Sequence, residues 1–448
     1  MSPNKRGIIY TLNQKPPLLE AIFAAFQHFM AIFIPIITPT LIIGNMLNLY
    51  VEIPYLISMA LIVSGIATFI QVKRIGFVGS GLLSIQGTSF AFLAPILAMG
   101  LVMRDKGVGS QEILGTIFAL CFFGAFIEII ASWFLGKLKK IITPIVTGTV
   151  VTIIGLTLIK QAVINIGGGS SLLQQNSKLF GSYTNLLLAF VTIFIIIICN
   201  ISKSQILRMT SIFVGLLGGF ILSIFLLEVD FSTVQSLPAI SIPVPFKYGF
   251  NFKPEFFLPI ALVYLITTIE SIGDLTATSV VSNEPIKGNT YIKRLKGGVL
   301  GDGVNSLLAS VFNTFPNTTF SQNNGVIQLT GVASRFVGII VAILLFIFGL
   351  FPYIGGVFRL IPEPVIGGAT LIMFGSVAAA GIRIISTTRI DRRAVLILSV
   401  SLGLSLGVEY IPEILQNMPK IVRNVFGSPI STGGITAILL NILFNRED

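Results

Sequence analysis

The fold of this chain is decided by a polar stretch at residues 316–325, which reads PNTTFSQNNG. The stretch lies in a chain of 448 residues that is 54% hydrophobic and 10% charged, with a mean hydropathy of +0.93. Soluble domains carry about 25% charged residues, so the composition indicates a membrane protein. A polar segment at membrane depth is tolerated only where it is buried in protein or lines a cavity. The stretch therefore marks a candidate cavity, although an ordinary extracellular loop remains the alternative.

Long apolar runs on both sides of this stretch predict an all-α polytopic membrane protein. A membrane-spanning helix needs about 20 apolar residues, and four runs without charge meet this length: 141–159, 184–202, 209–227 and 336–358. Shorter or more polar runs bring the predicted spans to fourteen: 19–44, 52–70, 82–101, 113–135, 256–281, 297–312, 320–334, 363–381, 394–408 and 430–444.

The formal charge of +11 is explained by orientation in the membrane. Most of the 29 Lys and Arg residues fall in cytoplasmic segments if the N-terminus lies inside, as the positive-inside rule requires. Fourteen spans then place both termini in the cytoplasm, with the chain in the cytoplasmic membrane. The expected partner of the basic residues is anionic lipid of the bilayer, and no nucleic acid is expected. Cys121 and Cys199 lie in separate apolar runs, without the spacing of a metal site or a disulfide framework.

Two short stretches resemble each other and predict an internal repeat. Residues 139–149 read KKIITPIVTGT, and residues 359–369 read RLIPEPVIGGA. One proline and two glycines keep their register: Pro144 with Pro364, Gly148 with Gly368, and Gly155 with Gly375. The match aligns span five with span twelve, and a separation of seven spans places the copies in opposite orientations. A 7+7 inverted repeat is a transporter architecture, and chance likeness of two Gly/Pro-rich helices is the alternative.

The inverted repeat predicts where a ligand would bind. Such transporters place the substrate near the midplane, between interrupted segments at corresponding positions of the two halves. Residues 84–90 in span three read SIQGTSF, which is a polar patch that weakens a helix. Spans three and ten are also seven apart. We therefore expect residues 84–90 and 316–325 to face each other at a central site.

Ionisable side chains inside the predicted spans are candidates for function, because each costs at least ~2.5 kcal/mol at the centre of a membrane helix. Glu270 and Asp274 are four residues apart and therefore share one helical face. Asp302 lies in span nine, and His28 follows Gln27 in span one. The apolar surroundings of Glu128 in span four make it the weakest candidate: Cys121-Phe122-Phe123-Gly124-Ala125-Phe126-Ile127 precede it.

These groups allow more than one role. A carboxyl group in a partly dry cavity can hold a proton in one state and release it in another, so Glu270 or Asp302 could couple transport to protons. Alternatively, the acids pair with Arg335, His28 or backbone amides to hold helices together, and His28 acts as a hydrogen-bonding group in helix packing.

An amide and a carboxylate together could recognise a planar heterocycle. Gln322 carries both a donor and an acceptor, so with Glu270 it could bind a ring that has adjacent carbonyl and N–H groups. Phe90, Phe92 or Phe320 could stack on such a ring.

Residues 322–335, which read QNNGVIQLTGVASR, resemble the signature of the nucleobase-ascorbate transporter family, also called nucleobase:cation symporter family 2. The signature there is Gln or Glu, then Asn, any residue, Gly, four more residues and Thr. Three further places in the chain fit the same family in order: Gln27-His28, Gly87-Thr88-Ser89-Phe90-Ala91-Phe92, and Glu270 with Gly273-Asp274. The resemblance therefore covers essentially the whole chain.

The resemblance implies a fold with two domains. The core domain would contain spans one to four and eight to eleven, in residues 1–135 and 256–358. The gate domain would contain spans five to seven and twelve to fourteen, in residues 136–255 and 359–448. Spans three and ten would each consist of a short strand and a half-helix, and members commonly form homodimers through the gate domain.

The resemblance also implies the site and the coupling ion. The substrate would lie between the strands and contact Glu270, Gln322 and Asn323, with backbone amides near Ser89 and Phe90 contributing. Site support or proton coupling would fall to Asp302, Asp274, His28 and Gln27, with the proton as coupling ion and without a cofactor or a metal. The remaining signature positions are Gly325, Thr330 and Arg335.

Gln at the first signature position resembles the purine branch of the family, which transports xanthine and uric acid, whereas uracil permeases tend to carry Glu there. Xanthine permeases often carry Asn where this chain has Ser89, which favours uric acid. We therefore expect proton-coupled uptake of an oxidised purine by an elevator-like movement. The alternatives are a permease for uracil or another nucleobase, and a sulfate-permease-like anion transporter of the same fold. An enzyme is not expected, because the sequence offers no metal-binding cluster or nucleophile–base pair.

Overall fold

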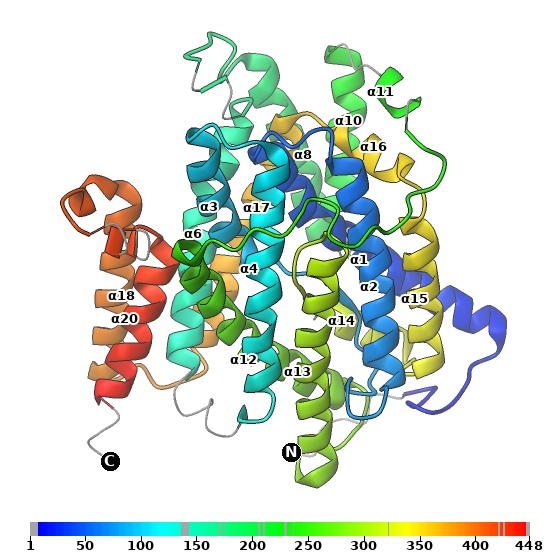
Figure 1. The fold of residues 1–448 in the computed structure, drawn as a ribbon. Coiled ribbons are helices and arrows are strands. Elements are labelled where there is room, and N and C mark those ends of the chain that lie inside the picture. Colours follow the sequence, from blue (N-terminus) through cyan, green and yellow to red (C-terminus); the bar gives the residue numbers. More distant parts are fainter. Residues whose placement is uncertain are drawn as a thin grey trace.

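The computed structural model describes residues 8–135, 143–169, 172–173, 175–204, 207–208, 211–227, 231–235, 237–320, 322–419, 422–423 and 426–444. Within these ranges the chain forms a bundle of helices that run mostly alongside one another (Figure 1). Eight described helices are long and apolar enough to cross a membrane: α1 (Leu18–Met46), α2 (Ile53–Lys73), α4 (Ser110–Ala131), α6 (Pro144–Ile166), α8 (Tyr183–Ile201), α12 (Phe257–Val281), α17 (Glu363–Ile385) and α18 (Arg392–Tyr410).

Shorter helices complete the bundle. A ninth span is possible if α15 (Arg335–Gly349) and α16 (Tyr353–Arg359), which meet at a bend of 72°, are counted together. The other α-helices in the described ranges are α3 (Leu93–Asp105), α10 (Ser211–Leu226), α11 (Ser232–Gln235), α13 (Gly288–Val311), α14 (Gln322–Thr330) and α20 (Pro429–Phe444). The 3₁₀ helices in the same ranges are η1 (Phe90–Phe92), η2 (Pro254–Phe256) and η3 (Pro412–Leu415).

The helices pack in two groups. The first group contains α1 to α4 and α12 to α15, and the second contains α6, α8, α10, α17, α18 and α20. In Figure 1, α18 and α20 lie at one side of the molecule, while α2 and α15 lie towards the opposite side. Contacts between the groups run mainly from α3 and α12 to α6 and α20. A boundary between two packed groups therefore passes through the middle of the bundle.

Helices α6 and α17 begin within the two stretches that resemble each other and carry their matching prolines and glycines, and the two helices pack closely. Pro144 and Pro364 both lie in the first turn of their helix, where a missing N–H costs nothing and a fixed φ fits the helix. A Cβ atom added to Gly155 would lie 2.3 Å from the backbone nitrogen of Ala378. The neighbours run in reverse order along the two helices: Gly148 with Ile385, Gly155 with Ala378, and Gly367 with Asn165. The helices are therefore antiparallel, and glycine permits their close approach.

Two short strands interrupt the bundle between α2 and α3 and between α13 and α14. Strand β1 (Gln86–Thr88) pairs with β2 (Asn317–Thr319) in an antiparallel register. All six residues of the strands are buried. The alternative of an ordinary extracellular loop is therefore wrong for residues 317–319, because their backbone polar groups are paired inside the protein.

Several predicted spans differ from the helices in extent. The predicted span at 82–101 holds β1 and η1 before a helix begins at Leu93, and the predicted span at 320–334 contains only the nine residues of α14 in helical form. Threonine in these segments favours a strand, and glycine and asparagine favour turns over helix. In contrast, α13 begins at Gly288 rather than at residue 297. Its first turns carry Lys293, Arg294 and Lys296. These charged residues lower the hydropathy, so the predicted span began only after them, although they belong to the same helix.

Candidate functional site

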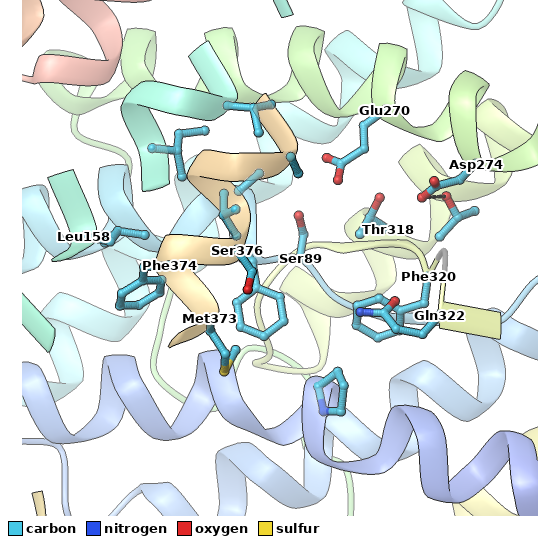
Figure 2. Close-up of a pocket in the computed structure, with 18 of the residues that line it drawn as sticks. Ser89, Leu158, Glu270, Asp274, Thr318, Phe320, Gln322, Met373, Phe374 and Ser376 are labelled. Carbon is cyan, nitrogen blue, oxygen red and sulfur yellow. Dashed lines mark hydrogen bonds between the residues drawn. The ribbon is translucent and has the colours of Figure 1, made fainter. Parts of the chain in front are cut away.

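A cavity of about 310 Å³ lies where the two groups of helices meet. One side is formed by α12 and the two strand segments, and the other by α6 and α17 (Figure 2). The first side carries the polar groups, and its lining residues are Ser89, Phe90, Ala91, Glu270, Asp274, Thr318, Thr319, Phe320 and Gln322. The second side is mostly apolar and is lined by Val151, Ile154, Leu158, Met373, Phe374, Ser376, Val377 and Ala380.

The cavity brings Glu270 and Gln322 together. Glu270 projects from α12 and Gln322 from the first position of α14, and both side chains are exposed towards the cavity. Figure 2 shows them with Ser89 and Thr318 around one space, opposite Met373 and Phe374. No side chain of the described residues donates a hydrogen bond to Glu270, so its carboxyl group is available to a ligand.

The strand pair uses its own backbone groups near the cavity. The Ser89 N–H donates to the carbonyl of Pro316 at 2.8 Å, and the Phe320 N–H donates to that of Ile85 at 3.0 Å. The expected contribution of a free backbone amide at Ser89 is therefore not available in this structure, although the Ser89 side chain lines the cavity.

On the polar side of the cavity, the aromatic rings come from Phe90 and Phe320. A Cβ atom at Gly87 would lie 2.1 Å from Cε2 of Phe320, so only glycine lets this ring lie against β1. Phe92, in contrast, is buried and packs edge-on against Tyr264, with ring centroids 4.5 Å apart. The suggestion that Phe92 stacks on a ligand is therefore wrong, because its ring is part of the helix packing.

Asp302 lies behind the cavity and holds the strands to the helices. Its carboxylate is completely buried. Gln71 Nε2 and Gln86 Nε2 each donate to Asp302 Oδ1 at 2.8 Å, and the Ser271 hydroxyl donates to Oδ2. Asp302 on α13 thus joins α2, β1 and α12. Ser271 directly follows the candidate Glu270 in a polar part of span eight, whereas composition and spacing did not indicate Gln71, although an amide inside an apolar span is a signal that could have found it.

Asp274 lies one helical turn beyond Glu270 and also lines the cavity. Its Oδ2 accepts a hydrogen bond from the Thr319 hydroxyl at 3.4 Å, which Figure 2 shows as a dashed line. The Thr278 hydroxyl, one turn further on, lies 2.8 Å from both the backbone carbonyl of Asp274 and Oδ1 of Asn324, and its one hydrogen is shared between these two acceptors. These contacts connect α12 with β2 and α14.

Asn323 and His28 do not line the cavity. Asn323 is buried, and its Nδ2 donates to the carbonyl of Leu83. His28 on α1 is also fully buried, beside Asn323. Gln27 faces an open groove with Thr330 and lies outside the central cavity. A direct contact of Asn323 with a ligand is therefore not present here, because its amide binds the loop before β1.

The rest of the signature lies at the far end of α14. The Thr330 hydroxyl donates to the carbonyl of Val326 at 2.9 Å, and Arg335 Nε donates to the carbonyl of Gly81. The N-terminal segment runs beside this loop, because the Arg335 N–H donates to the carbonyl of Leu12 at 3.0 Å. Gly325 lies inside α14 itself. Thr330 and Arg335 therefore position α14 and do not contact the cavity.

One part of the site was not indicated by the sequence, and another, Glu128, was ranked as the weakest candidate. The apolar wall from α6 and α17 has no signal in a chain in which 54% of residues are hydrophobic. Glu128 is 1% exposed and interacts electrostatically with Asp302 and Glu270, so the lipid-rich context that made it the weakest candidate does not describe its position. Helix α4 presents this residue to α12 and α13 and not to lipid.

Among the described residues, no group of three or more His, Cys, Asp or Glu could hold a metal ion.

Comparisons with known proteins agree with these features. A family model described as the permease family matches residues 19–414. The xanthine permease XanQ of Escherichia coli K12 is 48% identical over 437 residues, which cover 97% of this chain and 93% of that protein. The xanthine permease XanP of the same organism is 47% identical over 444 residues, which cover 98% of this chain and 95% of that protein.

The fold is also found in a solved structure. The murine anion transporter Slc26a9, in its inward-facing state, superposes with a TM-score of 0.66 and covers 97% of this chain and 69% of that chain, at 11% identity. At this identity the likeness concerns the fold alone. The protein is thus a multi-pass membrane permease and not an enzyme. The chain belongs to the permease family whose signature it carries, the nucleobase-ascorbate transporter family.

Proposed function

We propose that this protein takes up an oxidised purine, xanthine or uric acid, across the cytoplasmic membrane together with protons. The observation that carries the proposal is the shared cavity of Glu270 and Gln322. An ionised Glu270 can accept from ring N–H groups, and the Gln322 amide can donate to an oxo group and accept from a neighbouring N–H. The two xanthine permeases at 47–48% identity support the same class of substrate.

The amide at position 322 favours a purine over uracil. A second carboxylate at this position would offer acceptors only, whereas an amide also offers two donors to the carbonyl groups of an oxidised purine. Uric acid is largely a monoanion at neutral pH, so a neutral amide suits it better than another negative charge. Ser89, which lines the same cavity, leaves more room than an asparagine would. Xanthine and uric acid therefore both remain candidate substrates.

The proposed architecture is a 7+7 inverted repeat of fourteen spans. The antiparallel strands β1 and β2, and the antiparallel packing of α6 against α17, support opposite orientations of the two halves. We assign the first group of helices to a core domain in residues 1–135 and 256–358, and the second group to a gate domain in residues 136–255 and 359–448. The cavity lies between them, so an elevator-like shift of the core against the gate would expose it to each side in turn.

Three further properties belong to the same proposal. Both termini would lie in the cytoplasm, as the distribution of Lys and Arg favours. Protons would be the coupling ion, without any cofactor, because the cavity collects carboxyl groups and the described residues place no cation against them. The protein would form a homodimer through the gate domain.

An uptake assay tests the proposal. Cells that lack their own purine permeases would express the chain and receive radiolabelled xanthine, urate, uracil or sulfate, each with and without a protonophore. We expect accumulation of xanthine or urate, and we expect the protonophore to abolish it. Sulfate uptake without purine uptake would instead support the anion transporter that the likeness to Slc26a9 allows, and uracil uptake alone would overturn the assignment of Gln322.

A further inference from the structure

Helix α4 carries a buried carboxyl group for which the proposed substrate site has no role. Glu128 is 1% exposed, and its Oε1 atom has no hydrogen-bond partner among the described residues. The helix is otherwise apolar at this level, with Ala125 and Ile129 in contact with α13. An ionisable side chain inside a membrane protein costs free energy and is a candidate for a functional role by default.

Other acids surround this group. Glu128 interacts electrostatically with Asp302 on α13 and with Glu270 on α12. Tyr264 on α12 is also close, but its hydroxyl donates to the carbonyl of Cys121. A Cβ atom at Gly303 would lie 2.9 Å from the backbone nitrogen of Ile129, so α4 and α13 touch beside Glu128. The charged and titratable groups that face Glu128 from α12 and α13 are thus two carboxyls and a phenol.

No cation offsets these acids in the part of the chain that the structure describes. The four ion pairs found there involve Glu409, Glu52, Glu112 and Glu284, and none involves Glu128, Glu270 or Asp302. These three carboxyl groups, together with Asp274 beside Glu270 and Asp302, cannot all be ionised in a membrane interior without a counter-charge. At least one of them carries a proton.

Hydrogen bonding distinguishes the three groups. Asp302 accepts from Gln71, Gln86 and Ser271, and three donors suit a carboxylate, which can only accept. Glu270 is exposed to the cavity, where water or a ligand can solvate its charge. Glu128 has neither donors nor an exposed surface. Of the three, it is the group whose neutral acid form the structure fits best.

We propose that Glu128 is the proton-holding residue of the transport cycle. In the loaded state, Glu128 is a neutral acid and Glu270 is an ionised acceptor for the ring N–H groups of the purine. When Glu128 loses its proton, a further negative charge is added to those of Glu270 and Asp302, the ionised form of Glu270 is disfavoured, and the purine is released. Proton and purine binding thereby strengthen each other, as linkage requires, and one proton accompanies each purine.

This inference rests on the proposed function, and its consequences are specific to pH. The experiment uses the purified full chain and radiolabelled xanthine over a range of pH, with Glu128→Gln as the test variant, because glutamine has the shape of the neutral acid. Glu112→Gln, on the same helix but at the surface in a pair with Lys253, is the matched control. The ionisation of xanthine itself affects all proteins equally, so the comparison between variants removes it.

We expect Glu128→Gln to bind xanthine at high pH as tightly as the wild type does at low pH, with a flattened dependence on pH. In proteoliposomes it should retain exchange of xanthine but lose accumulation driven by a proton gradient. Glu112→Gln should behave as the wild type in both assays. Wild-type pH dependence and wild-type accumulation in Glu128→Gln would overturn the inference.

Infrared difference spectroscopy between low and high pH gives a second readout, which also serves if Glu128→Gln fails to fold. The wild type should show the C=O stretch of a carboxylic acid that shifts in frequency in Glu128→Asp, and an unshifted band would overturn the inference. The two proposals fail differently. A wild type that binds no purine contradicts the proposed function, whereas a wild type that binds purine beside a Glu128→Gln variant with unaltered pH dependence contradicts only the role of Glu128.

Discussion

Gln86 on strand β1 donates a hydrogen bond of 2.8 Å to Asp302 on helix α13. The same carboxylate accepts from Gln71 on α2 and from Ser271 on α12, one residue after Glu270. The acid behind the cavity therefore fixes the strand and the helix that together form the polar wall. Asp302 affects the site through these elements, without lining the cavity itself.

Replacement of Asp302 separates its charge from its hydrogen bonds. Asp302→Asn keeps acceptors for Gln71 and Gln86 and offers an NH₂ group to Ser271, so we expect a folded protein that exchanges xanthine. If Asp302 takes part in coupling, accumulation driven by a proton gradient should be lost; persistent accumulation would make its role structural. Asp302→Ala leaves three buried donors unsatisfied at about 1–3 kcal/mol each. We expect it to lower the melting temperature of the purified protein clearly more than Asp302→Asn does.

Glu270 should be essential for binding. Glu270→Gln removes the charge of the acceptor, and hydrogen bonds to charged groups contribute about 1.5–3 kcal/mol. This corresponds to a loss of about 10- to 100-fold in affinity for the purine. Equilibrium binding of labelled xanthine to purified protein measures the effect, with Glu255→Gln in η2 as a control outside the cavity. Wild-type affinity in Glu270→Gln would remove Glu270 from the site.

Gln322 should determine which heterocycle is preferred. Gln322→Glu removes both amide donors and adds a negative charge near Glu270 and Asp274. We expect either a shift of preference from purines towards uracil-like ligands or a loss of binding. Competition of unlabelled xanthine, urate and uracil against labelled substrate measures the preference. An unchanged profile would show that the amide is not read by the substrate.

The family and the helical membrane fold could be predicted because their signals are local. Apolar runs indicate spans, and the residues from Gln322 to Thr330 carry the signature in one continuous piece. The polar patches that contain Gln86 and Asn317 could be singled out because polar sequence is rare in such a chain, and the structure pairs them as strands.

The remaining features depend on packing across the bundle. Nothing in the neighbours of Glu128 in sequence indicates that α4 turns this residue towards Asp302, because an apolar surrounding is equally compatible with lipid. Likewise, Phe90 and Phe92 are two residues apart, and only the fold decides that the first lines the cavity and the second packs against Tyr264.

The packing of α6 against α17 should tolerate alanine in place of Gly375 but not in place of Gly155. Gly155 and Gly375 occupy matching positions six residues beyond the two stretches that resemble each other. A Cβ atom at Gly155 would lie 2.3 Å from a backbone nitrogen, whereas one at Gly375 would meet nothing within 4 Å. Overpacking costs about 1–3 kcal/mol or more, so Gly155→Ala should lower the melting temperature and the yield of folded protein.

Gly375→Ala is the matched control and should leave thermal stability unchanged or slightly raised, because alanine is the better helix former. Size-exclusion chromatography of heated samples in detergent compares the two variants. Equal stability of Gly155→Ala and Gly375→Ala would contradict the close approach of α6 and α17.

The most direct test of the central claim is a cryo-electron microscopy map of the protein with bound xanthine. We predict a flat density between β1, β2 and α12, within hydrogen-bonding distance of both the Glu270 carboxyl group and the Gln322 amide. Ligand density elsewhere in the molecule, or density that contacts only one of these two side chains, would contradict the claim that they hold one heterocycle between them.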